Sequence, residues 1–292
     1  MRAEPSGPKA LPSGSLPSMP GPARMSPADA AIFETFVVPR YLSLFGELVL
    51  EMLADSDDAQ VAHLFCRTGY PDRGVALKLS GAHIVGTDPS SAAIELARAK
   101  AATMPEMVSD YRVCEDLPTT LPSDAFSHAL TLHPIMDAEE RGLLLQELAR
   151  VLAPNGQALV AMPLRGSFQE VGDLLREYAL KFDDNTVALA VDRATNARPT
   201  VEVLGAQLEE VGFDFVDVSL RPATFAFRSG RDFFEDPIAR LLVLPEVRLN
   251  LGLSEAEGID KALTYVRDAI DKYWSDGAFE LTVNVGCATG RR

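Results

Sequence analysis

The chain has 292 residues, of which 47% are hydrophobic and 24% are charged, and its formal net charge is −15. This length suits one large domain, whose core needs neither disulfide nor metal for stability. The negative charge argues against nucleic acid and anionic membranes as partners, because basic side chains that attract phosphate are in deficit. The three cysteines form no Cys-x-x-Cys pair, so we expect no metal site. Their small and odd number favours reduced thiols in a cytoplasmic protein.

The first 27 residues are rich in Pro, Ser and Gly. Seven prolines occur among them, and the segment lacks the apolar stretch of a secretory signal. Such a composition buries too little apolar surface to offset the entropy lost on ordering. We therefore expect a disordered tail over residues 1–27, with a Pro-rich docking peptide as the alternative. Residues 28–292 are expected to form one domain without a membrane-spanning helix.

Helical periodicity opens this domain, and strands then alternate with helices. Apolar residues recur at helical spacing in residues 30–53, which predicts N-terminal helices within residues 28–56. The predicted strands, in chain order, are 61–66, 83–89, 107–116, 126–135, 157–164, 213–227 and 278–290. The predicted helices are 75–82, 91–102, 137–152, 167–182, 201–213 and, as a helical cover before the last strand, segments within 231–275.

This alternation predicts an α/β fold with a doubly wound, mostly parallel seven-stranded sheet. Strands joined through helices form parallel units with right-handed crossovers. The last two strands are expected to form an antiparallel edge. Ligands in such sheets bind at the carboxyl ends of the strands where the strand order reverses. The loop after the first strand, from Cys66 to Asp72, is therefore the expected place for chemistry.

The order of the elements resembles the class I S-adenosylmethionine-dependent methyltransferases, especially the small-molecule types, over about residues 45–225. VAHLFCRTGY resembles the family's glycine-rich first motif, and HIVGTDPS resembles the second-strand motif that ends in a ribose-binding acid. EDLPTTLPSDAFSHALTLHPI, ELARVLAPNGQALVAMP and GAQLEEVGFDFVDV resemble later segments of the family. The resemblance implies a class I methyltransferase-like fold and S-adenosylmethionine as cofactor, although a fold by itself does not establish activity.

The first motif departs from the family pattern of an acid followed by three alternating glycines. The resemblance places His63 at the acid, Phe65 and Arg67 at the first two glycines, and Gly69 at the third. Glycines let the backbone approach a ligand closely, whereas a ring and a long cation fill that space. An unpaired buried charge costs several kcal/mol, comparable with the roughly 8 kcal/mol of a micromolar ligand. We therefore expect the ordinary cofactor pose to be obstructed. Alternatively, His63 and Phe65 pack in the core, and Arg67 is solvated, salt-bridged or bound to an anion.

Asp88 is the best-preserved residue of the candidate cofactor site. It lies 19 positions after Gly69, close to the spacing of a ribose-binding acid. The alternative is a turn residue before Pro89, which is a common use of Asp. Asp88 and Pro89 are therefore candidate cofactor-binding residues.

The resemblance also implies an acid after the third strand, near the adenine amino group. Val113 occupies that position, but a shift of two or three residues brings in Glu115 or Asp116. His133 lies near the carboxyl end of the fourth strand and is the one candidate catalytic residue, since an imidazole can act as a base near neutral pH. A structural role is its alternative. The candidate cofactor-binding residues are Cys66, Arg67, Gly69, Asp88, Pro89, Glu115 and Asp116.

Three functions are compatible with these residues. The first is a methyltransferase-fold protein with an eroded S-adenosylmethionine site and a non-catalytic regulatory, scaffold or protein-binding role. The second is an active S-adenosylmethionine-dependent methyltransferase acting on a small molecule or a protein. The third is a pocket recruited to another anionic small ligand, with Arg67 and His133 as anchors. The expected partners are a protein or a small-molecule ligand, and apolar faces of the N-terminal helices or the helical cover would allow a homodimer.

Overall fold

The computed structural model describes residues 24–105 and 107–292, so that residues 1–23 of the predicted tail lie outside the described residues. The strands are β1 (Gln60–Leu64), β2 (His83–Asp88), β3 (Val108–Val113), β4 (Phe126–Leu132), β5 (Leu152–Pro163), β6 (Asp214–Phe227) and β7 (Phe279–Arg291). The helices before β5 are α1 (Pro27–Ile32), the π-helix η1 (Phe33–Leu42), α2 (Ser43–Met52), α3 (Asp72–Lys78), α4 (Ser91–Ala101) and α5 (Ala138–Val151). The helices after β5 are α6 (Gln169–Phe182), α7 (Asn185–Ala197), α8 (Val201–Glu210), α9 (Gly230–Glu235), the π-helix η2 (Ala239–Val243), α10 (Leu244–Leu251) and α11 (Ile259–Tyr273).

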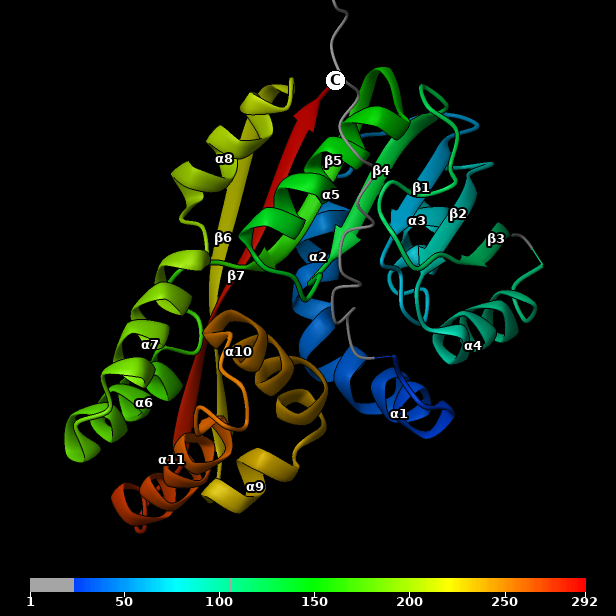
Figure 1. Ribbon diagram of the computed structural model, residues 1–292. Helices are drawn as coiled ribbons and strands as arrows, with labels where there is room; N and C mark the ends of the chain where they lie inside the picture. The colour runs from blue at the N-terminus through cyan, green and yellow to red at the C-terminus, as the bar shows by residue number, and fades with distance from the viewer. Residues whose placement is uncertain (1–23, 106) are drawn as a thin grey trace, which may run out of the picture.

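The strands form one seven-stranded sheet with the order β3-β2-β1-β4-β5-β7-β6 (Figure 1). β1 to β5 are parallel to one another, whereas β7 pairs antiparallel with both β5 and β6. This arrangement confirms the predicted doubly wound, mostly parallel sheet with an antiparallel edge. The strand order reverses between β1 and β4, which fixes where a ligand crevice is expected.

Residues at the helix starts explain why these segments fold locally as predicted. Asp137 forms a capping box with Glu140: its Oδ1 accepts from the Glu140 N–H at 2.9 Å, and Glu140 Oε2 accepts from the Asp137 N–H at 3.0 Å. Ser90 caps α4 by accepting from the Ala93 N–H. The predicted starts of these two helices are therefore confirmed.

The sheet separates two apolar layers of the core. Val61 and Ala62 are neighbours on β1, yet they belong to different clusters, because successive side chains of a strand point to opposite faces. The N-terminal helices and the late helices cover one face, for example with Phe45 of α2. α5 and α8 cover the other face, with Leu148 and Leu204 among the buried residues. Within residues 24–105 and 107–292, no helix has both the length and the apolar character needed to cross a membrane.

Helices α6, α7, α9, α10 and α11 gather around the part of β6 and β7 that runs past the other strands (Figure 1). α6 packs against α7 and α11, and α10 packs against α7. The sequence predicts two helices between β5 and β6, but the structure has a third, α7. Asp184 caps α7, and Val187, Ala190 and Val191 form its buried face. That spacing is typical of one face of an amphipathic helix.

Candidate functional site

A crevice lies at the carboxyl ends of β1, β2 and β4, where the strand order reverses. Its volume is about 90 Å³. Small-molecule sites usually have volumes of about 300 to 1,000 Å³. The crevice is therefore much smaller than a pocket for a nucleoside cofactor. The residues that line it are Arg24, Met25, Asp29, Phe65, Arg67, Asp88, Pro89, Ser90, Pro134, Ile135, Arg240, Leu241 and Pro245.

The loop after β1 has the backbone of a glycine-rich turn without two of the glycines. Phe65, Arg67 and Gly69 all lie in the left-handed region, with φ of 53°, 48° and 74°. This region is unfavourable for residues other than glycine, and a residue with a side chain held there costs about 1 to 2 kcal/mol. The alternating pattern coincides with the three positions that the sequence assigns to glycines.

The Arg67 side chain spans the crevice from β1 to β4. Its Nη1 donates to the Leu132 carbonyl oxygen at 2.8 Å, and its Nη2 donates to the His133 carbonyl oxygen at 2.5 Å. The guanidinium also lies over the Phe33 ring, 5.5 Å from the ring centroid. Arg67 is only 8% exposed. Both terminal nitrogens of Arg67 thus bind the protein's own backbone, and they hold the side chain where a ligand would lie.

Asp88 ends β2 as predicted, and both of its carboxylate oxygens accept hydrogen bonds from the chain. Oδ2 accepts from the Arg67 N–H and Oδ1 from the Ser90 N–H, each at 2.9 Å. Burial raises the pKa of the Asp88 carboxyl, although these two hydrogen bonds favour its charged form. Asp88 therefore anchors the turn at Arg67 as well as the start of α4.

Segments far apart in the sequence close the crevice from outside. Asp29 of α1 pairs with Arg240 of η2 at 2.7 Å between Oδ1 and Nη1. The Ser90 hydroxyl donates to the Met25 carbonyl oxygen at 3.3 Å. α1 and η2 thus meet over the carboxyl ends of the strands. The sequence predicts a helical cover within residues 231–275, which includes η2, but it does not predict the pairing of that cover with α1.

Comparisons with known proteins agree with this architecture. Residues 65–160 match the family model described as a methyltransferase domain. A malonyl-[acyl-carrier protein] O-methyltransferase of Halorhodospira halophila is 31% identical over 125 residues, which are 40% of this chain and 41% of that protein. The chain therefore matches about two fifths of the length of this curated relative. Together with the sheet order, these matches support a class I methyltransferase fold.

Two solved structures are similar in fold to this protein. The YcgJ protein from Bacillus subtilis has a TM-score of 0.54 and 11% identity, with 86% of this chain and 98% of that chain covered. Phosphoethanolamine N-methyltransferase 2 of Haemonchus contortus, solved with S-adenosyl-L-methionine, has a TM-score of 0.51 and 14% identity, with 90% and 57% covered. At these identities the likeness shows the fold alone.

The acid that the methyltransferase family has on β1 is replaced here by a histidine that binds an acid from another element. His63 Nδ1 lies 2.7 Å from Asp72 Oδ1 at the start of α3, and the Tyr111 hydroxyl donates to Asp72 Oδ2 at 2.7 Å. Burial by itself raises the pKa of the Asp72 carboxyl, but His63 and the two hydrogen bonds outweigh it and lower that pKa below its usual value. His63 is thus part of a buried network, as the core-packing alternative predicts, and Asp72 is a partner that sequence reasoning missed.

The structure brings some of the predicted cofactor residues together and places others elsewhere. Arg67, Asp88 and Pro89 line the crevice. Cys66 is buried beside them, and burial raises the pKa of its thiol well above the usual value, which keeps it protonated. Gly69 faces Tyr111 on the far side of the loop, where an added Cβ would lie 2.9 Å from the hydroxyl oxygen.

The two predicted acids after β3 lie outside the crevice. Glu115 and Asp116 are exposed, and Glu115 Oε2 pairs with Arg24 Nη2 at 2.7 Å. Arg24 itself lines the crevice, so Glu115 reaches the site through this ion pair and not directly. Within the described ranges, no group of three or more His, Cys, Asp or Glu residues is arranged to hold a metal ion.

His133, the candidate catalytic residue, is fully buried behind the crevice and is not among its lining residues. Its Nε2 lies 2.9 Å from the Tyr41 hydroxyl and 3.6 Å from Glu246 Oε2. Burial, and then the charge of Arg67, lower the pKa of His133 well below its usual value. The imidazole is therefore neutral near pH 7 and shielded from any molecule in the crevice, which favours the structural alternative.

Proposed function

We propose that this protein is a methyltransferase-fold protein without methyl-transfer activity. Its cofactor crevice is closed by its own chain, and it acts by binding a protein partner or a small molecule in a regulatory or scaffold role. The observation that carries the proposal is the Arg67 guanidinium, held between β1 and β4 by two backbone carbonyls. S-Adenosylmethionine does not fit the residues in this arrangement, because the free volume is about 90 Å³.

The cost of moving Arg67 aside can be compared with the binding energy of a cofactor. Withdrawal of the guanidinium leaves the carbonyl oxygens of Leu132 and His133 without their donors, at about 1 to 3 kcal/mol each. The total of about 2 to 6 kcal/mol is a large part of the roughly 8 kcal/mol of a micromolar ligand. The affinity for the cofactor would fall by about 30-fold to more than 10,000-fold. Separation of α1 from η2 would lower the affinity further.

Calorimetric titration with S-adenosylmethionine tests the proposal. We expect no submillimolar binding by the wild-type protein, whereas the Haemonchus contortus enzyme, solved with this cofactor, serves as positive control. The double variant Phe65→Gly/Arg67→Gly should bind more tightly than wild type, because it clears the loop. Arg231→Gln, at an exposed position on α9, is the matched control and should behave as wild type. Submillimolar binding by the wild-type protein would overturn the proposal.

An active methyltransferase acting on a small molecule or a protein is the second candidate. It is supported by Asp88, which keeps its place at the end of β2, and by the methyltransferase named among the relatives. This function requires α1 and η2 to separate and Arg67 to leave the crevice. Transfer of a labelled methyl group to an acceptor, abolished by Asp88→Ala but not by Arg231→Gln, would establish it in place of the first.

A further inference from the structure

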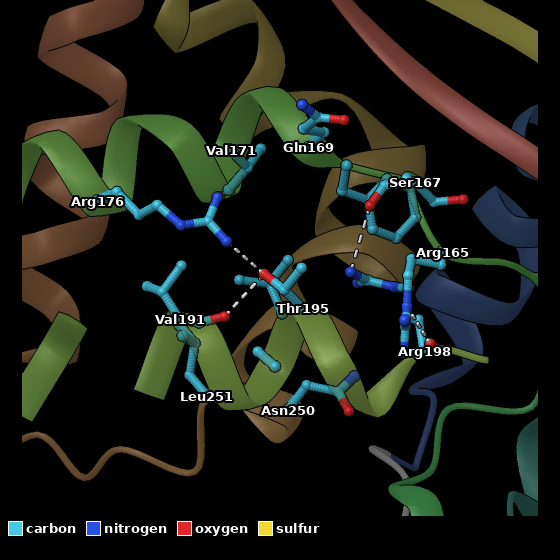
Figure 2. Close-up of a pocket in the computed structure, with 15 residues that line it drawn as sticks. Arg165, Ser167, Gln169, Val171, Arg176, Val191, Thr195, Arg198, Asn250 and Leu251 are labelled. Atoms are coloured by element: carbon cyan, nitrogen blue, oxygen red, sulfur yellow. Dashed lines mark hydrogen bonds between the residues drawn. The ribbon is translucent and has the colours of Figure 1, made fainter. Parts of the chain in front are cut away.

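A second cavity lies among the helices that follow β5, and α10 borders both sites, with Pro245 lining the crevice and Val247 lining this cavity. Its volume is about 280 Å³, close to the lower end of the range for small-molecule sites. α6, α7 and α10, with the segment Arg165–Phe168, supply its walls (Figure 2). The cavity therefore suits a ligand smaller than a nucleoside cofactor.

Three arginines line this cavity, and no acidic residue lines it among the described residues. Arg165 carries no ion pair in the described part of the chain, and its Nε and Nη2 donate to backbone carbonyls. Arg176 donates to the Thr195 hydroxyl at 2.8 Å (Figure 2), and its two acidic partners, Asp173 and Asp192, are more than half exposed. The lining of the cavity itself therefore carries cations without an acid among the described residues.

Arg198, which lines this cavity, has a donor without a partner among the described residues. Its Nε donates to Glu246 Oε1 at 2.7 Å, and its Nη1 donates to the Ser167 carbonyl oxygen at 3.3 Å (Figure 2). Its Nη2 is buried and has no hydrogen-bond partner among the described residues. A buried donor of a charged group without an acceptor is costly, so an acceptor brought by a ligand would be favourable.

The rest of the lining is apolar, with a few neutral polar groups. Val171, Val191, Val247 and Leu251 supply apolar surface, and the Phe168 ring stacks on Arg198 at 4.7 Å from the guanidinium carbon. Arginine's planar fork matches a carboxylate, and apolar walls match a short hydrocarbon or aromatic body. We propose that this cavity binds a small organic carboxylate, with its anionic end on Arg198 and Arg165.

This proposal does not rest on the state of the crevice. Arg67 and the cofactor question are tested by titration with S-adenosylmethionine, whereas the cavity is tested with a different ligand and different variants. Either can fail while the other holds.

Calorimetric titration with benzoate tests the carboxylate site, with benzyl alcohol and inorganic phosphate as comparison ligands. We expect saturable binding of benzoate and at least about tenfold weaker binding of each comparison ligand. Benzyl alcohol lacks the charge, and phosphate lacks the apolar body. Arg198→Gln should weaken benzoate binding by about 10- to 100-fold, because a hydrogen bond to a charged group is lost. Arg165→Gln, at an exposed position, should weaken it in the same direction without affecting folding.

Gly172→Leu supplies a test that does not depend on charge or on a buried ion pair. Gly172 borders the cavity, and the nearest atom to an added Cβ is Arg176 Nη1 at 3.8 Å, an ordinary contact. Leucine also favours a helix more than glycine does, so the variant should fold and fill part of the cavity. We expect loss of benzoate binding in Gly172→Leu and unchanged binding in Arg231→Gln. Absence of saturable benzoate binding by the wild type, equal binding of phosphate, or unaltered binding in Gly172→Leu would each overturn the proposal.

Discussion

Replacing Arg67 with glycine sets two physical effects against each other. Arg67 has a φ of 48°, in the left-handed region where a side chain costs about 1 to 2 kcal/mol, so glycine alone would relieve strain. The same change removes two hydrogen bonds from a charged donor to the carbonyls of Leu132 and His133, each worth about 1.5 to 3 kcal/mol. The losses exceed the gain. We expect Arg67→Gly to lower the free energy of unfolding by about 3 kcal/mol.

Phe65→Gly is the matched control, because Phe65 has a similar φ of 53° in the same loop. Its ring makes no polar contact and is partly exposed, so the relief of strain should roughly balance the packing that is lost. The measurement is urea unfolding followed by far-ultraviolet circular dichroism at pH 7. Arg67→Gly should be less stable than Phe65→Gly by at least about 2 kcal/mol. If Arg67→Gly is as stable as wild type or more stable, the guanidinium does not hold the crevice closed and the reasoning is refuted.

Three further predictions concern pH and the cover of the crevice. The pKa of His133 is lowered on folding, so the unfolded chain binds the extra proton, and stability should fall by up to about 1.4 kcal/mol per pH unit below about 6.5. His133→Asn, which tolerates a φ of 47°, should flatten this dependence in urea midpoints between pH 7.5 and 5. The pKa of the Asp72 carboxyl is lowered on folding. The ionised carboxylate therefore stabilises the folded protein above about pH 3.8, and this stabilisation is lost as the pH falls through the pKa of the folded state. Asp72→Asn should therefore destabilise the protein more at pH 7 than at pH 3. Arg240→Ala removes the partly exposed pair with Asp29 and should cost less than about 1 kcal/mol, without improving cofactor binding in calorimetry because Arg67 stays in place.

Local signals in the sequence predict most of the fold. Strand and helix periodicities give the alternation of elements, and residues such as Asp137 and Ser90 mark helix starts by their side-chain caps. α7 is the exception. Its buried face consists of Val187, Ala190 and Val191, and the rest of the helix is Asn, Thr, Ala, charged residues and the exposed Leu189. Such a weak apolar stripe becomes convincing only through packing against α6 and α10, which the sequence does not display.

The sequence predicts which positions form the candidate site, but it does not predict which residues contact one another there. The spacing of residues 65, 67 and 69 identifies the turn, and their left-handed backbone agrees with it. The acceptors of the Arg67 guanidinium lie 65 and 66 residues away, and the partner of Asp29 lies 211 residues away. Tertiary structure alone creates these pairs, since helix and strand periodicities report only on near neighbours in the chain. The sequence predicts from bulk that residues 65 and 67 obstruct the crevice, but it does not indicate the contacts that Arg67 makes.

The departures from the methyltransferase pattern support one another physically. A histidine replaces the acid on β1, and Asp72 supplies the compensating negative charge from α3. A cation replaces a glycine in the loop, and its backbone N–H binds Asp88 while its side chain binds β4. Replacing Arg67 with glycine would uncover two buried carbonyls, and replacing His63 with an acid would place a second acid beside Asp72. Each replacement is thus accompanied by a hydrogen-bond partner on another element, and a double-mutant cycle between His63 and Asp72 should give a coupling energy of at least about 1 kcal/mol.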